Sequence, residues 1–359
     1  MKNGFWNNLP KPFFVLAPLA NVTDASFRQF IVSFYRERKI SNKKSRFTRP
    51  PALAGGGPDV LWTEFVSADG LCHPVGRKAL LEDLVFQENE RPIVAQLFTA
   101  YPEKMREAAR LVAELGFDGV DINMGCPDKN VMKQGAGASC MRDPDNALAL
   151  IQAAKEGVRD AGKDIPVSVK TRLGFNEDAL EEWLPKLLSV EPAAITLHAR
   201  TKKDMSQVPA RWERVKRAVE IRDELQSKTL IIGNGDVIDM ADARNKVAET
   251  GCDGVMFGRA VFGNPWLFDE QKETITVAEK LDAALVHTEM YLDHWQGKKS
   301  FELMKKFYRA YINNFPLAKE LRAEMMMAKS LEEVQVVVEK FKSVHPEVLS
   351  QVSETKYLL

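Results

Sequence analysis

Short apolar segments rich in β-branched and aromatic residues alternate with amphipathic segments over the first three quarters of the chain. Each apolar segment has the length of one buried strand, and each amphipathic segment repeats apolar positions at helical spacing. In the segment before Gly116, for example, Met105, Ala109 and Val112 share one helical face. The pattern predicts strands at residues 13–18, 60–68, 92–98, 119–125, 166–172, 193–200, 229–236 and 254–260.

Eight strand–helix units within roughly 250 residues indicate an α/β fold of the (β/α)8 TIM-barrel class, because a doubly wound sheet usually has fewer strands. In such barrels the loops after the strands meet at one rim, where active sites lie. The residues at the predicted strand ends are therefore the first candidates for function. They are Pro18, Glu64, Gln96, Asn123, Lys170, His198, Asn234 and Gly258.

The pattern changes near residue 270, after which only helical periodicity remains. We expect a barrel domain over residues 1–270, followed by a C-terminal all-helical domain over residues 271–359. The segment 37–59 contains three consecutive glycines, paired prolines and a basic run. We expect it to form a long loop inserted in the barrel domain.

Charge and cysteine content change this picture only slightly. Fifty basic residues balance fifty acidic ones, but ten basic residues fall within the first fifty positions against two acidic ones. Such a run is compatible with a solvated surface or with a phosphate-binding face. Four cysteines and five histidines lack metal-ligand spacing, so we expect no metal site. The sequence has no apolar run of about 18 residues, so we expect a cytoplasmic protein with no leader and no membrane partner. We also expect it to be monomeric.

Glycines follow the seventh and eighth predicted strands, in "GNGD" (233–236) and "GRA" (258–260). They could simply make tight turns. In barrels, however, the same two loops often bind a phosphate group through their backbone N–H groups. Arg259 could add a charge-assisted contact. We expect a phosphorylated cofactor or substrate, and FMN suits a barrel that carries no Gly-x-Gly-x-x-Gly motif.

Four polar side chains at the strand ends suit a flavin ring. A cation such as Lys170 would stabilise the anionic reduced ring, and His198 could hydrogen-bond it. The amides of Gln96 and Asn123 match the donor–acceptor edge of a flavin or a uracil. The alternatives are a lysine that extends to solvent, a histidine held by backbone groups, and amides that belong to turns.

Cys126 lies in a Gly-Cys-Pro turn after the fourth predicted strand. Pro127 restricts Cys126 to an extended conformation, which keeps the thiol at the rim. A thiol with the usual pKa of about 8.5 is protonated at neutral pH and can act as a general acid. We expect Cys126 to give a proton to a developing carbanion. A buried apolar role suits Cys252, Cys140 and Cys72.

These motifs resemble the tRNA-dihydrouridine synthases over nearly the whole chain, from about residue 13 to 345. The resemblance is carried by "APLANVTDASFR", "TEFVSADGL", "DINMGCPDKNVMKQGAGA", "VKTRLGF", "LHARTK", "GNGDV" and "GRAVFGNPWLF". It implies an FMN-dependent barrel enzyme that uses NADPH to reduce the C5–C6 double bond of uridine in tRNA. The flavin would pass a hydride to C6, and the cysteine would protonate C5.

The resemblance also implies roles for individual residues. Cys126 would be the acid, while Asn123, Lys170 and Arg172 would lie near the uracil or the flavin. The implied FMN-binding residues are Ala17, Pro18, Leu19, Gln96, Lys170, His198, Asn234, Gly235, Asp236, Gly258 and Arg259.

A uridine within folded RNA must leave its stack to reach a barrel rim, and phosphate contacts must offset that cost. Asn130 stands where the family usually has a lysine, which leaves the choice of uridine open. Two other interpretations remain, namely a flavin barrel acting on a small-molecule pyrimidine or enone, and a non-enzymatic RNA-binding relative. The expected RNA contacts are Lys129, Lys133, Lys305, Lys306 and Arg309.

Overall fold

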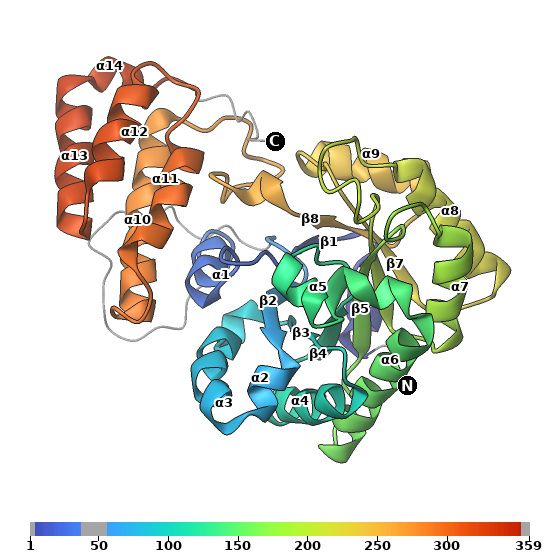
Figure 1. The fold of residues 1–359 in the computed structure, drawn as a ribbon. Helices are drawn as coiled ribbons and strands as arrows, with labels where there is room; N and C mark the ends of the chain where they lie inside the picture. Colours follow the sequence, from blue (N-terminus) through green and yellow to red (C-terminus); the bar gives the residue numbers. More distant parts are fainter. Residues whose placement is uncertain (1–3, 37–55, 353–359) are drawn as a thin grey trace. The chain divides into compact units, whose positions relative to one another are not determined.

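The computed structural model describes residues 4–36 and 56–352, and eight parallel strands form its single sheet in the order β1-β8-β7-β6-β5-β4-β3-β2 (Figure 1). The two ends of the sheet meet, because the Leu16 N–H donates to the Val60 carbonyl at 3.2 Å and the Asp59 N–H donates to the Phe14 carbonyl at 2.8 Å. The predicted barrel is confirmed. Its strands are β1 (Phe13–Leu16), β2 (Leu61–Ser67), β3 (Ile93–Phe98), β4 (Gly119–Asn123), β5 (Val167–Arg172), β6 (Ala194–His198), β7 (Leu230–Asn234) and β8 (Gly254–Phe257).

Helices between the strands surround the barrel (Figure 1). Local signals set their ends. The Asp143 side chain accepts the Asn146 N–H at the start of α6, and Gly251 ends α9 in the left-handed conformation with φ 70°. The helices of this part are α2 (Ala68–Cys72), α3 (Pro74–Leu80), α4 (Pro102–Glu114), α5 (Lys129–Lys133), α6 (Pro144–Asp160), α7 (Leu180–Ser189), α8 (Trp212–Glu224) and α9 (Met240–Thr250).

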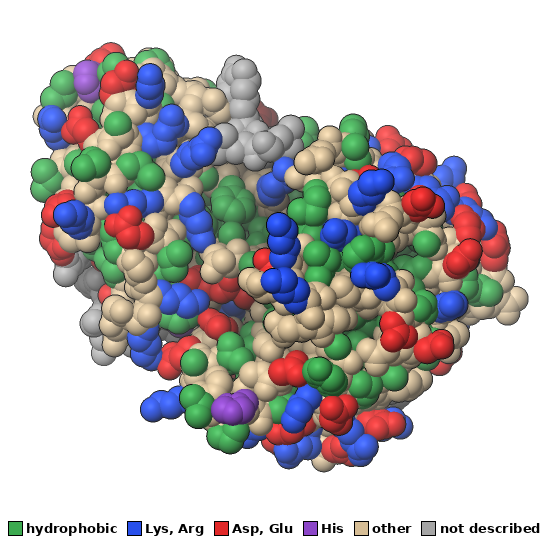
Figure 2. Space-filling model, in the orientation of Figure 1, with side chains coloured by type: hydrophobic (Ala, Val, Ile, Leu, Met, Phe, Trp, Pro, Cys, Tyr) green, Lys and Arg blue, Asp and Glu red, His purple; other side chains and the backbone are tan. Residues whose placement is uncertain are grey.

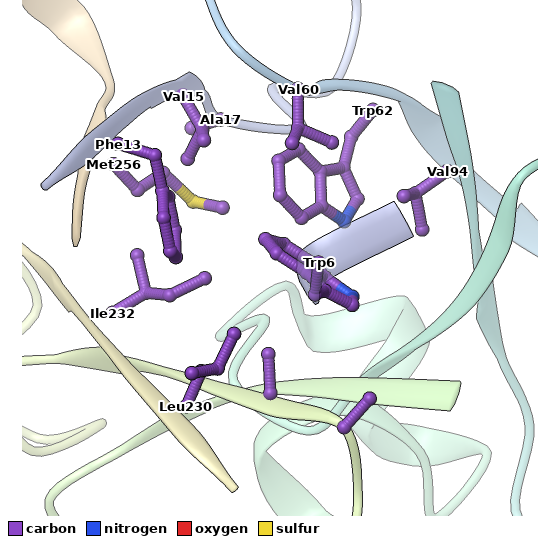
Figure 3. Packing of buried hydrophobic residues seen from close by; sticks show 12 residues of the cluster. Trp6, Phe13, Val15, Ala17, Val60, Trp62, Val94, Leu230, Ile232 and Met256 are labelled. Carbon is purple, nitrogen blue, oxygen red and sulfur yellow. The ribbon is translucent and has the colours of Figure 1, made fainter. Parts of the chain in front are cut away.

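An apolar cluster fills the barrel interior, with side chains of different strands pointing toward one another (Figure 3). Trp6, from the short 3-10 helix Gly4–Asn8, is 2% exposed. Its ring centroid lies 5.4 Å from that of Phe13 and 6.0 Å from that of Trp62. In barrels of this class the interior is packed with side chains, and the active site lies at the end where the strands terminate.

The chain divides into two compact units, Met1–Thr23 with Pro58–Gly258 and Asp24–Gly57 with Arg259–Leu359. In the second unit, α1 packs on α10 although the barrel separates them in sequence, and Trp295 Nε1 donates to Asp24 Oδ2 at 2.8 Å. Of the predicted loop 37–59, residues 37–55 lie outside the described residues. The helices of this unit are α1 (Ala25–Val32), α10 (Val277–Trp295), α11 (Lys305–Tyr311), α12 (Ala318–Met327), α13 (Leu331–Val344) and α14 (Pro346–Leu349).

Candidate active site

Strands β3, β4 and β5 line one side of the barrel interior with polar side chains. Gln96 lies beside Asp121 in the sheet register, Asp121 lies beside Ser168, and Asn123 lies beside Lys170. Alternate residues of a strand share a face, so the two residues named from β4 point inward together, as do those from β5. Gln96 and Asp121 are fully buried. The inward-facing side chains of β3, β4 and β5 therefore form a polar surface next to the apolar cluster.

The Cys126 turn is held by the last residue of β4. Asn123 Oδ1 accepts the Gly125 N–H at 3.1 Å and the Cys126 N–H at 2.9 Å. On the other side, the Ala138 N–H donates to the Cys126 carbonyl at 2.9 Å. Gly137 has a φ of 60°, and a Cβ at that position would lie 2.8 Å from the Cys126 carbonyl oxygen. The glycine thus allows a close approach that fixes the turn from both sides.

The Cys126 side chain is half-buried. Burial raises the pKa of the Cys126 thiol above its usual range, and the Asp128 backbone N–H only partly opposes this effect. The positive charges of Arg172 and Lys170 lower the pKa of the thiol by smaller amounts. The thiol is therefore protonated at neutral pH.

Lys170 reaches from β5 toward β7. Its Nζ donates to Asn234 Oδ1 at 3.0 Å, and the Asn234 amide is oriented because its Nδ2 donates to the Met256 carbonyl at 2.8 Å. Burial, and to a smaller extent the charge of Arg172, lower the pKa of Lys170 to about 8, and the charge of Asp121 opposes the change. In residues 4–36 and 56–352, no carboxylate forms an ion pair with Lys170.

Arg172 is buried and hydrogen-bonds three backbone carbonyls. Its Nε donates to Gly125 at 2.8 Å, and its Nη1 donates to Thr201 at 3.1 Å and to Met205 at 3.3 Å. Burial lowers the pKa of Arg172 to about 10. Arg172 therefore joins the Cys126 turn to the loop that follows β6.

His198 lies beside a buried arginine that the sequence interpretation missed. Arg200 is 3% exposed, its Nη1 lies 3.3 Å from His198 Nε2, and its Nη2 pairs with the Asp236 carboxylate. A guanidinium only donates, so His198 Nε2 accepts and the ring proton is on Nδ1. The Asp236 carboxylate also accepts the Ala210 N–H at 2.8 Å. The sequence signal that could have identified Arg200 as a site residue was its position two residues after His198.

The remaining predicted FMN-binding residues occupy several environments. Ala17 and Pro18 are buried, and half-buried Leu19 packs against the apolar cluster. Gly235 has a φ of 131°, and a Cβ at Gly258 would meet nothing within 4 Å. Arg259 belongs to the second compact unit. The free space at Gly258 suits a group that approaches the backbone closely.

The predicted RNA-binding residues of the barrel, Lys129 and Lys133, are exposed on α5. Figure 2 shows Lys and Arg side chains over the region of α5 on the face in view. Asp128 accepts the N–H groups of Asn130 and Val131 at 2.8 and 3.1 Å, which starts this short helix directly after the Cys126 turn.

The predicted RNA-binding residues of the helical unit differ in their surroundings. Lys305 pairs with Glu302 at 2.8 Å, and the Lys306 Nζ lies 4.9 Å from the centroid of the buried Phe307 ring. Arg309 is exposed. It lines an open cavity of about 380 Å³, whose other lining residues are Lys319, Arg322, Ala323 and Met326. The sequence interpretation missed Lys319 and Arg322, because nothing in the helical pattern separates them from other surface cations.

Among the described residues, no group of three or more His, Cys, Asp or Glu side chains could hold a metal ion. In the same part of the chain, no helix combines the length and the apolar character needed to cross a bilayer.

A closed barrel whose polar residues gather at the strand ends defines a (β/α)8-barrel enzyme with its site at the rim. The family model described as dihydrouridine synthase matches residues 15–345. The chain therefore belongs to the dihydrouridine synthase family, and the resemblance found in the sequence is confirmed.

Individual relatives agree with this assignment. The chain is 35% identical over 345 residues to a probable tRNA-dihydrouridine synthase of Staphylococcus aureus (strain MRSA252), covering 96% of this chain and 97% of the relative. It is 36% identical over 343 residues to probable tRNA-dihydrouridine synthase 2 of Bacillus subtilis (strain 168), covering 95% and 97%.

Proposed function

We propose that this protein reduces the C5–C6 double bond of specific uridines in tRNA to dihydrouridine, with FMN as cofactor, NADPH as electron source and Cys126 as general acid. The relatives named above support tRNA as the substrate. The observation that carries the proposal is the Cys126 turn, which Asn123 and Ala138 hold at the barrel rim and whose half-buried thiol has a pKa raised by burial.

The residues at the rim fit FMN. Lys170 is a cation whose hydrogen bond goes to a neutral amide oxygen, so an anionic ring would find an available positive charge. The empty space at Gly258 suits a phosphate group approaching the backbone. We assign the ring to the side of Gln96, Lys170 and His198, and the phosphate to Gly235 and Gly258.

The chain's own residues would position the uracil and supply the proton. When bound, FMN reduced by NADPH supplies the hydride that adds to C6. The Cys126 Sγ–H gives its proton to C5, and the resulting thiolate takes a proton back from solvent. Arg172 and Lys170 stabilise that thiolate, because both positive charges lower the pKa of the Cys126 thiol.

We assign RNA backbone binding to the helical unit as well as to Lys129 and Lys133. The cavity lined by Arg309, Lys319 and Arg322 has three cations and no carboxylate in its lining. Arg322 Nη1 donates to the Ile312 carbonyl at 2.9 Å, which orients the guanidinium and leaves its other nitrogens for a phosphate. Lys305 contributes less, because it already pairs with Glu302.

Substitution of Cys126 tests the acid role. Cys126→Ala should keep the flavin absorbance and the oxidation of NADPH, while dihydrouridine formation falls by about 10² to 10⁴-fold. Cys72→Ala is the matched control, because Cys72 is also half-buried but is the last residue of α2, and it should retain wild-type activity. Product formation by Cys126→Ala within a few-fold of wild type would refute the acid role.

The salt dependence of RNA binding tests the helical unit. The double variant Arg309→Glu, Lys319→Glu should bind tRNA more weakly and reduce the slope of log K against log salt by about 1 to 2. Lys329→Glu is the control, since exposed Lys329 lines a different cavity together with Glu289, Asp293 and Glu332. An unchanged slope in the double variant would exclude this cavity from the RNA interface.

If free uridine reoxidised the reduced flavin faster than tRNA did, a small-molecule substrate would replace RNA.

A further inference from the structure

The buried carboxylate of Asp121 has no role in the function proposed above. It lies on β4, two residues before Asn123, and is fully buried. Its Oδ1 accepts the Ser168 hydroxyl at 2.5 Å, and its Oδ2 accepts the Gln96 Nε2 at 2.7 Å. Burying a carboxylate costs folding free energy unless hydrogen bonds compensate. A buried Asp121 close to the Cys126 turn therefore suggests a role for its charge.

We propose that Asp121 is a positioning residue for Cys126. Its carboxylate sets the direction of two hydrogen-bonded side-chain amides, those of Gln96 and Asn123. The Asn123 side-chain oxygen in turn holds the Cys126 turn. The proposal rests on the acid role of Cys126, because its consequence for activity is a correctly placed thiol.

The direction follows from what each group can donate or accept. An ionised carboxylate only accepts, so the Gln96 NH2 group must face Asp121. The Gln96 oxygen then faces the other way and accepts the Asn123 Nδ2 at 2.9 Å. Asn123 therefore turns its own oxygen toward the backbone, where it accepts the N–H groups of Gly125 and Cys126.

A reversed chain would be unfavourable at its end. If the Gln96 amide turned over, its NH2 group would face the NH2 group of Asn123, and that amide would turn in response. The Asn123 NH2 group would then face two backbone N–H groups, and both hydrogen bonds to the Cys126 turn would be lost. An ionised Asp121 prevents this reversal because it has no proton to donate to the Gln96 oxygen. A protonated Asp121 could donate to that oxygen and would allow the reversal.

The surroundings of Asp121 make its charge sensitive to pH. Burial raises the pKa of Asp121 to about 6, and the hydrogen bonds from Gln96 and Ser168 and the charge of Lys170 oppose the increase. The indole of Trp62 on β2 also favours the charged form. The amide chain is thus held in one direction above about pH 6 and is free to reverse below it.

Two variants separate the charge from the hydrogen-bond direction. Asp121→Asn is neutral at every pH and can donate to the Gln96 oxygen as a protonated carboxyl does, so at pH 7.5 it should lower kcat to the level that the wild type reaches below pH 6 and abolish the decline of kcat near pH 6. Asp121→Leu removes the acceptor and should lower kcat at least tenfold, with little change in KM for tRNA. Asp253→Asn is the control, because Asp253 is a buried carboxylate directly before β8 and should leave the pH profile unchanged.

Amide NMR spectra of the flavin-free protein provide a readout that does not depend on activity. With 15N-labelled Gln and Asn, the side-chain signals of Gln96 and Asn123 should shift with a midpoint near pH 6 in the wild type and not in Asp121→Asn. If Asp121→Leu does not fold, the pH profile and spectra of Asp121→Asn still decide. Wild-type behaviour of both Asp121 variants, with an inactive Cys126→Ala, would refute only the positioning role. An active Cys126→Ala would instead refute the acid role on which it rests.

Discussion

Lys170 Nζ donates to Asn234 Oδ1 at 3.0 Å, which links β5 to β7 across 64 residues of sequence. The acceptor is neutral, so nothing in this contact compensates for the burial that lowers the pKa of the ammonium group to about 8. Lys170 is therefore charged below about pH 8 and loses its charge as the pH rises through that value. If Lys170 binds an anionic cofactor, the affinity for that cofactor must depend on pH in the same range.

We expect the affinity for FMN to fall above pH 8 because Lys170 becomes neutral. The dissociation constant of the flavin-free wild type should rise by up to roughly tenfold per pH unit between pH 8 and 9.5. Lys170→Met should bind FMN more weakly at pH 7 and show no such rise. Quenching of flavin fluorescence measures both constants, and Lys186→Met, an exposed site on α7, is the control. A wild-type constant independent of pH would contradict this expectation.

Gly137→Ala should damage the Cys126 turn more than it damages the fold. Its Cβ would lie 2.8 Å from the Cys126 carbonyl oxygen, so the turn must move. Gly162→Ala is a matched control, because Gly162 also has a positive φ, 66°, but a Cβ there meets nothing within 4 Å. Both variants should lose about 1 kcal/mol of stability from backbone strain. Only Gly137→Ala should lose most of the dihydrouridine formation, and equal activities would contradict the role given to this contact.

Arg172→Lys should separate the two loops that the guanidinium joins. A lysine has one nitrogen and cannot reproduce the geometry that serves Gly125, Thr201 and Met205 together. We expect kcat to fall by roughly 10 to 100-fold, as a misplaced catalytic group would cause. Limited proteolysis should cleave the loop after β6 faster. Arg142→Lys, at an exposed site over Phe175, should change neither quantity.

His287 should make the helical unit sensitive to acid. Burial lowers the pKa of His287 to about 3, its ring stacks on Phe30, and among the described residues its Nε2 has no hydrogen-bond partner. The unfolded chain takes up a proton near pH 6.5 that the folded unit does not accept. Stability is therefore lost as the pH falls from about 6.5 toward 3, by up to about 1.4 kcal/mol per pH unit.

His287→Phe removes that proton and should make the free energy of unfolding fall less steeply in acid. Urea unfolding followed by circular dichroism between pH 4.5 and 7.5 measures the difference from wild type. His73→Phe, at an exposed site, should keep the wild-type pH dependence. Identical slopes for wild type and His287→Phe would show that another group dominates.

The strand positions and much of the rim could be predicted from the sequence. The alternation of buried strands and amphipathic helices is local, and all eight strands fall within the predicted segments. Other residues escaped prediction because they carry no local signal. Asp121 and Ser168 resemble ordinary strand residues, and their importance follows only from a register that places them side by side. Likewise, α1 belongs by sequence to the barrel but packs with α10.

The sequence by itself determined the fold class and the family, because both are read from the order and spacing of motifs along the chain. The tertiary structure decided which of those residues act on one another. Closing the barrel brings Lys170 to Asn234 and buries Asp121 beneath the Cys126 turn. Hydrogen-bond direction and pKa depend on burial and on neighbouring charges, and both exist only once distant strands have met.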